Sequence, residues 1–135
     1  YDPIPDGWLD TALGERWAGI RQVRQVVTTA LEVARNDGAI GASLQAAPVV
    51  HVDAAGAQLF AGEDAAALFI TSDAQITTDA APADAFRVEG IDNVAVAFAT
   101  ADGGKCARCW KIMPEVTSED GICNRCDDVV NAAAG

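Results

Sequence analysis

The longest regular pattern of apolar residues runs from about Leu13 to Asp37, where apolar positions recur three and four residues apart. Placed at 100° per residue, these positions gather on one face, which is typical of an amphipathic helix with a buried side. The predicted buried face consists of Ile20, Val23, Val27, Ala30, Leu31 and Ala34. Asp10 or Thr11 is suited to cap the start of this helix, and Gly38 is suited to follow its end in a left-handed turn.

Beyond the helix the apolar stretches are short, and several alternate with polar positions as strands do. The expected elements, in order, are a strand that starts near Pro48, a short helix over 54–64, a buried strand over 65–71, an edge strand over 74–78 and a final strand over 93–100. The pattern predicts an α+β fold, in which a long N-terminal helix packs on a small mixed α/β sheet.

All four cysteines lie near the end of the chain, as two C-x-x-C pairs with thirteen residues between them. Each C-x-x-C turn points two sulfurs into one small volume, and two such turns offer Zn²⁺ a tetrahedral set of thiolates. The spacing is that of zinc ribbons and knuckles. We expect one structural zinc ion on Cys106, Cys109, Cys123 and Cys126. Redox chemistry and free buried cysteines are the alternatives.

The chain shows no apolar signal-peptide core and no apolar run long enough to span a bilayer. We therefore expect a cytoplasmic protein with no membrane partner, in which thiols stay reduced. The predicted organisation is a lead-in and helix over 1–38, a small α/β junction domain over 39–104 and a zinc-binding module over 105–135.

The net charge of −11 argues against general adhesion to nucleic acid, so no DNA partner is expected and any RNA contact must use local clusters. One cluster lies in the cysteine segment and consists of Lys105, Arg108, Lys111 and Arg125, with Trp110 among them. For Trp110 the alternative to RNA stacking is packing of the zinc module onto the body.

A second group of basic residues, Arg21, Arg24 and Arg35, forms a stripe beside the apolar face of the predicted helix. The alternative for this stripe is a solvated flank. Nucleophile-elbow and glycine-rich phosphate motifs are missing, and His51 is the sole histidine. Because a four-cysteine zinc site also leaves no position open for substrate, we expect no catalysis by this chain.

The segment KCARCW…GICNRC resembles the C-terminal zinc-binding module of bacterial isoleucyl-tRNA synthetases, in which a tryptophan directly follows the second cysteine. Upstream, ERWAGIRQVRQVVTTALEVARNDGAIGASLQAAPVV is similar to the end of that family's anticodon-binding region, where a helix leads through an I-G-x-S-L-x-A turn into a strand. ITSDAQI resembles the family's small α/β junction. The resemblance covers nearly the whole chain, although the HIGH-like and KMSKS-like signatures of class I enzymes are missing from it.

The resemblance implies a C-terminal, anticodon-side tRNA-binding appendage of an enzyme that attaches isoleucine to its cognate tRNA using ATP. ATP would then bind only in a catalytic domain outside this chain. The implied partners are isoleucine tRNA and the upstream domains of the same enzyme. Trp110, with Arg108 and Lys111 beside it, would offer a surface to anticodon bases. The alternative function is a free-standing zinc-ribbon adaptor that docks a protein partner.

Overall fold

The computed structural model describes residues 5–134; residues 1–4, where the predicted lead-in begins, and residue 135 lie outside the described residues. In chain order the longer elements are α1 (Thr11–Asn36), β1 (Val49–Val52), α2 (Ala54–Leu59), α3 (Ala65–Phe69), β2 (Gln75–Thr77), β3 (Phe86–Val88), β4 (Ile91–Ala97), β5 (Gly104–Lys105), β6 (Ile112–Met113) and α4 (Asn124–Ala134). Two 3₁₀ turns, η1 (Asp6–Trp8) and η2 (Ser43–Gln45), precede α1 and β1.

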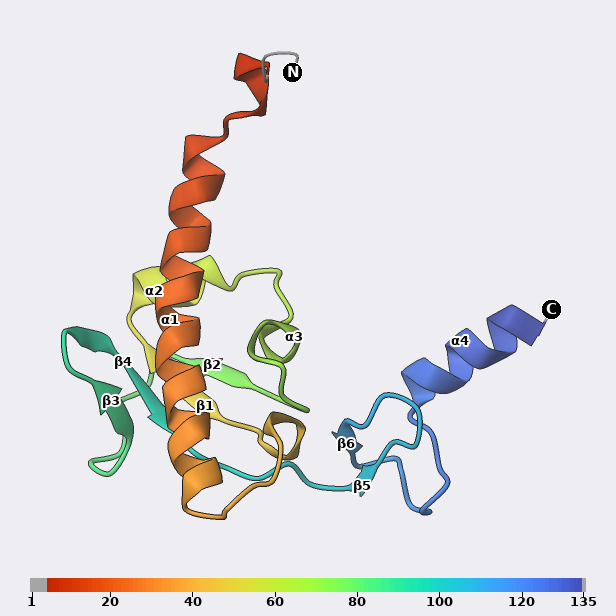
Figure 1. Cartoon of the computed structure of the whole chain (residues 1–135). Helices are drawn as coiled ribbons and strands as arrows, with labels where there is room; N and C mark the ends of the chain where they lie inside the picture. Colours follow the sequence, from red (N-terminus) through yellow and green to blue (C-terminus); the bar gives the residue numbers. More distant parts are fainter. Residues whose placement is uncertain (1–4, 135) are drawn as a thin grey trace.

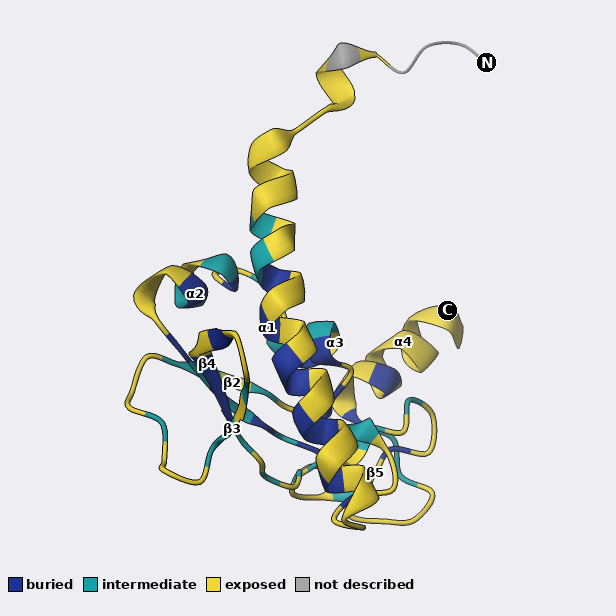
Figure 2. Cartoon of the chain, turned by 60° about the vertical axis from the view of Figure 1, so that its left-hand side comes forward, coloured by how far each residue is buried: buried dark blue, intermediate teal, exposed yellow. Residues whose placement is uncertain are grey.

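Helix α1 follows the sequence prediction closely. The Asp10 side chain accepts a hydrogen bond from the Leu13 N–H and caps the start of the helix, and Gly38 follows its end with φ of 77°. All six residues of the predicted apolar face are buried, together with Val26. The first turns of α1 extend past the sheet and are largely exposed (Figures 1 and 2).

The sheet has four strands in the order β2-β1-β4-β3. Strand β2 runs parallel to β1, whereas β1 pairs antiparallel with β4 and β4 antiparallel with β3, so the sheet is mixed. Helix α1 lies across one face of it (Figure 1), and the apolar face of the helix shares one core with residues of β1 and β4 such as Val50, Val94 and Val96. The predicted α+β arrangement of a long helix on a small mixed sheet is confirmed.

The prediction of a strand over residues 65–71 is wrong, because most of this segment forms the short helix α3. The Asp64 side chain accepts a hydrogen bond from the Ala67 N–H, which caps the helix, and the alanines that follow favour helix over strand. Ile70 ends the helix in a left-handed conformation, with φ of 58° and ψ of 47°. A short apolar run does not distinguish a buried strand from a helical turn, so periodicity alone could not decide here.

Strand β3, the two-residue strands β5 and β6, and helix α4 were not predicted from the sequence. The edge strand expected over 74–78 is confirmed as β2, and the final strand of the sheet is β4. Within residues 5–134, none of the helices combines the length and the apolar character needed to cross a membrane.

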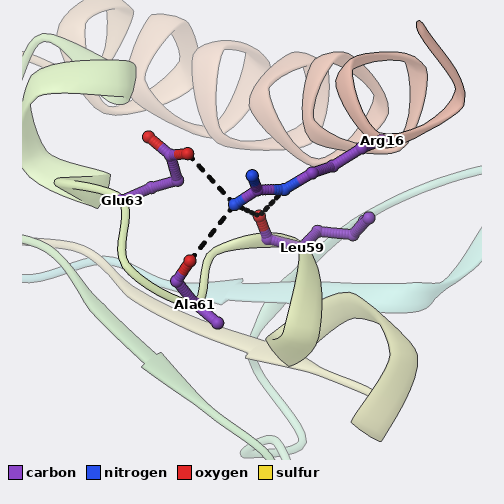
Figure 3. Close-up of polar contacts among 4 residues, drawn as sticks. All are labelled: Arg16, Leu59, Ala61 and Glu63. Atoms are coloured by element: carbon purple, nitrogen blue, oxygen red, sulfur yellow. Dashed lines mark hydrogen bonds and ion pairs between the residues drawn. The ribbon is translucent and has the colours of Figure 1, made fainter. Parts of the chain in front are cut away.

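Arg16 fastens α1 to the end of α2 (Figure 3). Its guanidinium donates to the Leu59 carbonyl from Nε and Nη2, at 3.2 and 3.1 Å, and Nη2 also donates to the Ala61 carbonyl at 3.1 Å. The same Nη2 lies 3.0 Å from the Glu63 carboxylate. One side chain therefore satisfies carbonyls at the C-terminal end of a short helix, where no backbone partner is available.

The cysteine segment forms a unit of its own beside the α/β body, and α4 projects away from it (Figure 1). Its small core consists of Cys106, Val116, Cys123 and Cys126, separate from the core of the body. Ser72 joins the two units, since its hydroxyl accepts a hydrogen bond from the Ile112 N–H at 2.6 Å and donates to the Leu44 carbonyl. The domain boundaries at residues 38/39 and 104/105 stay predictions.

Candidate metal centre

The four cysteine sulfurs converge at one point of the C-terminal unit. Cys106 and Cys109 lie on the turn between β5 and β6, whereas Cys123 directly precedes α4 and Cys126 lies in its first turn. Their Sγ atoms all lie within 4.8 Å of one another, and each cysteine is a free thiol. Three of the four side chains are buried and Cys109 is half-buried.

The spacing of these sulfurs fits a tetrahedral zinc site. With metal-to-sulfur distances of about 2.3 Å, tetrahedral geometry sets the sulfurs about 3.8 Å apart. The sulfurs of Cys109 and Cys123, which come from different C-x-x-C pairs, are 3.8 Å apart. No distance between two of the four sulfurs exceeds 4.8 Å, which is about 1 Å more than the tetrahedron needs. The four side chains are therefore able to hold one Zn²⁺ as a closed structural site.

The backbone around Cys106 is arranged for a negatively charged sulfur. The N–H groups of Cys109 and Cys123 donate to the Cys106 Sγ at 3.5 and 3.3 Å. Burial raises the pKa of the Cys106 thiol, but these N–H groups and that of Arg108 outweigh it and lower the pKa to about 6. The Arg108 guanidinium also lies 3.8 Å from the Cys126 Sγ. Donors directed at sulfur favour the thiolate form that binds metal.

Two other cysteines hold their protons more tightly. Burial raises the pKa of Cys109 to about 12. The Cys126 N–H lowers the pKa of Cys123, but burial and the sulfurs of Cys126 and Cys106 outweigh it and raise the pKa overall. Four thiolates at this distance would repel one another, whereas a divalent cation between them stabilises the charged forms. The arrangement is thus suited to a cation and poorly suited to four free thiolates.

Close backbone approach around the site depends on two glycines. A Cβ on Gly103 would clash with the carbonyl of Met113, and a Cβ on Gly104 would clash with the carbonyl of Val116. Gly103 also has φ of 118°, a conformation open mainly to glycine. These glycines let the chain pass close to residues 113–116, between the first C-x-x-C turn and the second.

Trp110 lies directly after the second cysteine in a left-handed conformation, with φ of 68°, and its side chain is 61% exposed. The Trp110 N–H donates to the Cys106 carbonyl and the Cys106 N–H donates to the Lys111 carbonyl, both at 2.9 Å. These bonds tie the backbone of Trp110 to the turn that carries Cys106 and Cys109, which we call the metal turn. The Lys105 ammonium lies 5.0 Å from the centre of the Trp110 ring. The structure therefore presents an indole ring to solvent with a cation beside it.

A hollow of about 590 Å³ lies next to the Trp110 ring, with Lys105, Thr117, Ser118 and Glu119 among the residues that line it. The last three were not identified from the sequence, because nothing in their local pattern sets them apart from an ordinary solvated loop. Their hydroxyl and carboxylate groups supply hydrogen-bonding partners beside an aromatic face.

The other predicted RNA-binding residues are distributed over both units. Arg108 and Arg125 are exposed and Lys111 is half-buried, all on the cysteine unit. The arginine stripe, which consists of Arg21, Arg24 and Arg35, is exposed on α1 and belongs to the α/β body. His51 lies in β1 with its Nδ1 3.1 Å from the Asp79 carbonyl, away from the cysteines, as expected for a strand residue with a satisfied ring.

Comparison with known proteins identifies relatives of the chain. It is 52% identical over 105 residues to the isoleucine–tRNA ligase of Ruegeria pomeroyi, 44% over 120 residues to that of Agrobacterium fabrum and 44% over 128 residues to that of Gluconobacter oxydans. These matches cover 76%, 88% and 93% of the chain. No family model matches it. The chain spans only 11–12% of the length of these relatives, but the matches cover most of the chain at 44–52% identity, and it therefore belongs to the isoleucine–tRNA ligase family.

Proposed function

We propose that this chain is the tRNA-binding, anticodon-side part of an isoleucine–tRNA ligase that attaches isoleucine to its cognate tRNA using ATP. The chain itself is non-catalytic in this proposal, and isoleucine and ATP bind elsewhere in the enzyme. The proposal is supported by relatives that carry this name and by the residues that the cysteine unit exposes. Its partners are isoleucine tRNA and the remaining domains of the same enzyme.

Zinc is the proposed cofactor, bound by Cys106, Cys109, Cys123 and Cys126. Apart from the cysteines, Val116 is the one fully buried residue in the described core of this unit. One buried aliphatic side chain contributes about 1.5–3 kcal/mol, which is far too little to order such a loop. The metal would therefore supply the folding free energy of the unit, as it does in other small zinc domains.

The observation that carries the proposal is the exposed ring of Trp110, which stands on a hydrogen-bonded backbone. An anticodon loop offers unstacked bases, which proteins bind on aromatic faces with neighbouring Arg or Lys groups. Trp110 has its backbone fixed by the metal turn and a lysine ammonium beside its ring. Such a preformed surface loses little conformational entropy on binding, so most of the stacking energy is available for affinity.

The experiment compares the full-length ligase with its Trp110→Ala variant. Loss of one stacked base costs about 1–3 kcal/mol, so tRNA affinity should fall about tenfold or more at constant salt. Formation of isoleucyl-adenylate should not change, because the proposed adenylation site lies outside this chain. Lys111→Ala should instead reduce the dependence of binding on salt, because it removes a phosphate contact.

Zinc content and thermal stability of each variant serve as the control. If Trp110→Ala lowers zinc retention and stability in step with tRNA affinity, the ring has a packing role and the stacking role is wrong. If it lowers neither stability nor affinity, the cysteine unit does not bind the anticodon side and the proposal fails at its central point.

A further inference from the structure

A second hollow, of about 180 Å³, lies on the α/β body between α1, η2 and the end of α3. Charged and hydroxyl groups from Arg24, Thr28, Arg35 and Ser43 line one part of it. Apolar side chains line the rest, among them Leu31 and Ile70. The hollow is smaller than the roughly 300–1,000 Å³ typical of drug-sized ligand pockets, so it suits one base or one phosphate.

The two arginines lie on the same side of α1. Arg24 and Arg35 are eleven residues apart, which is close to three helical turns and about 16 Å along the axis. Thr28 lies between them, one turn after Arg24. A neighbouring hollow of about 330 Å³ shares Arg24 and Thr28 and adds Arg21 and Gln25, so the lining continues along the helix. The arginine stripe thus borders two adjoining hollows along α1, both open to solvent.

These arginines have no charged partner. Within residues 5–134 the one ion pair is between Arg16 and Glu63, and neither Arg24 nor Arg35 donates a side-chain hydrogen bond there. Glu32 lines the same hollow, so two guanidinium groups and one carboxylate leave it with a net charge of +1. Unpaired guanidinium groups at a hollow of a chain with net charge −11 favour an anionic ligand over a solvated flank.

The apolar side of the hollow carries a strained residue. Ile70 has φ of 58° and is 54% exposed, although a β-branched residue in this conformation is rare. Its N–H donates to the Ala66 and Ala67 carbonyls of α3, and these bonds keep Ile70 in the left-handed conformation. Within the described residues, Ile70 and Trp110 are the two residues other than glycine with positive φ, and both expose a large apolar side chain. Strain that the fold retains in this way is often found where a protein binds a ligand.

We infer that this hollow is a second RNA contact, which binds one unstacked base against Ile70, while the phosphates next to that base lie outside the hollow, at Arg24 and Arg35. The inference rests on the proposed function, because it takes the ligand to be part of the same tRNA. It adds a contact on the α/β body, independent of the metal turn. The guanidinium groups supply charge-assisted hydrogen bonds to phosphate, and the apolar wall excludes water from the base.

The test uses the zinc-loaded chain, labelled with ¹⁵N, and an RNA hairpin with the anticodon stem-loop of an isoleucine tRNA. Amide resonances of Thr28, Ser43 and Ile70 should shift on titration, and adenosine 5′-monophosphate alone should shift the same resonances at higher concentration. Arg24→Gln and Arg35→Gln should each weaken hairpin binding about tenfold and make the slope of log K against log salt about 0.7 less steep.

Two further variants separate binding from folding. Arg87→Gln removes an exposed arginine from β3, at the edge of the sheet. This control should lower hairpin affinity much less than Arg24→Gln does, because it changes only the overall charge of the chain. Ile70→Gly should weaken hairpin binding without lowering the melting temperature, because glycine relieves the left-handed strain.

The outcomes distinguish this inference from the proposed function. Shifts confined to the metal turn around Trp110, with unchanged binding by both arginine variants, would overturn the second contact and leave the proposed function intact. Equal losses of hairpin affinity in Arg24→Gln and Arg87→Gln would also overturn it, because the overall charge of the chain would then explain both losses. If the hairpin shifts no resonance in either unit, the inference and the proposed function fail together.

Discussion

The pair Trp110→Gly and Trp110→Ala separates the backbone strain at residue 110 from the proposed contact of its ring with RNA. The φ of 68° at Trp110 is costly for any residue with a Cβ, by about 1–2 kcal/mol. Alanine retains this cost, whereas glycine removes it. Both variants lose the ring and with it the Lys105 contact at 5.0 Å, which is worth about 0.5–1 kcal/mol at an exposed site.

These terms give different stabilities for two variants that lack the same ring. Relief of strain in Trp110→Gly is partly offset by the greater chain entropy of glycine, about 0.5–1 kcal/mol. The glycine variant should therefore be about 1 kcal/mol more stable than the alanine variant. Because folding of the cysteine unit is coupled to metal in our proposal, this difference should appear as about fivefold tighter zinc binding.

The assay is competition for zinc against a chromophoric chelator at fixed pH, followed by tRNA binding of the corresponding full-length ligases. Trp110→Gly should hold zinc about as tightly as the unmodified protein, and both variants should lose tRNA affinity about tenfold or more. Weaker zinc binding by the glycine variant than by the alanine variant would refute the strain argument. Unchanged tRNA affinity in both would refute the stacking argument, whatever the zinc result.

Three further predictions concern metal, stability and the joint between the units. Removal of zinc by a chelator should abolish ordered amide resonances around Val116 while those of the α/β body persist, because the cysteine unit has little apolar core of its own. Arg16→Ala should lower the free energy of unfolding by about 1–3 kcal/mol in urea titrations, whereas Glu63→Gln, which removes only a partly exposed ion pair, should cost less than about 1 kcal/mol. Ser72→Ala should speed hydrogen exchange of the Ile112 amide, because it removes the acceptor of that N–H, and unchanged exchange would show that the joint is not needed.

The features predicted correctly from the sequence are those with strong periodicity or fixed spacing. The apolar face of α1 repeats from Ile20 to Ala34, over about four turns, so its burial was predictable, and the residues suited to cap the helix predicted both of its ends. The convergence of the cysteines was predictable from the two C-x-x-C pairs, since such turns have little choice of geometry. The alanine-rich segment at 65–71 has a length that suits a strand or a short helix, and the cap at Asp64 decides for a helix.

The features missed are set by tertiary contacts. Strand β3 has three residues and forms because β4 offers it an antiparallel partner. Helix α4 starts at the second C-x-x-C turn, where Cys123 and Cys126 lie close to the other two sulfurs. The left-handed conformations of Ile70 and Trp110 have no mark in the sequence, because glycine or asparagine is the usual residue there. For this reason the sequence identified Trp110 through its neighbours but gave no reason to consider Ile70.

The acidity of the chain limits how it can bind RNA, and this gives the two proposed contact sites a common physical basis. A protein with net charge −11 cannot rely on a broad basic face, so its affinity must come mainly from stacked or packed bases, with few phosphate contacts. If Lys105, Lys111, Arg24 and Arg35 are those contacts, log K should fall with log salt with a slope of about −3, which follows from roughly −0.7 for each phosphate of a single strand. Trp110→Ala should then lower affinity equally at all salt concentrations, whereas loss of any one of the four cations should make the slope less steep. A much steeper slope in salt titrations of the chain would mean that other basic residues bind phosphate and that bases contribute less than this argument requires.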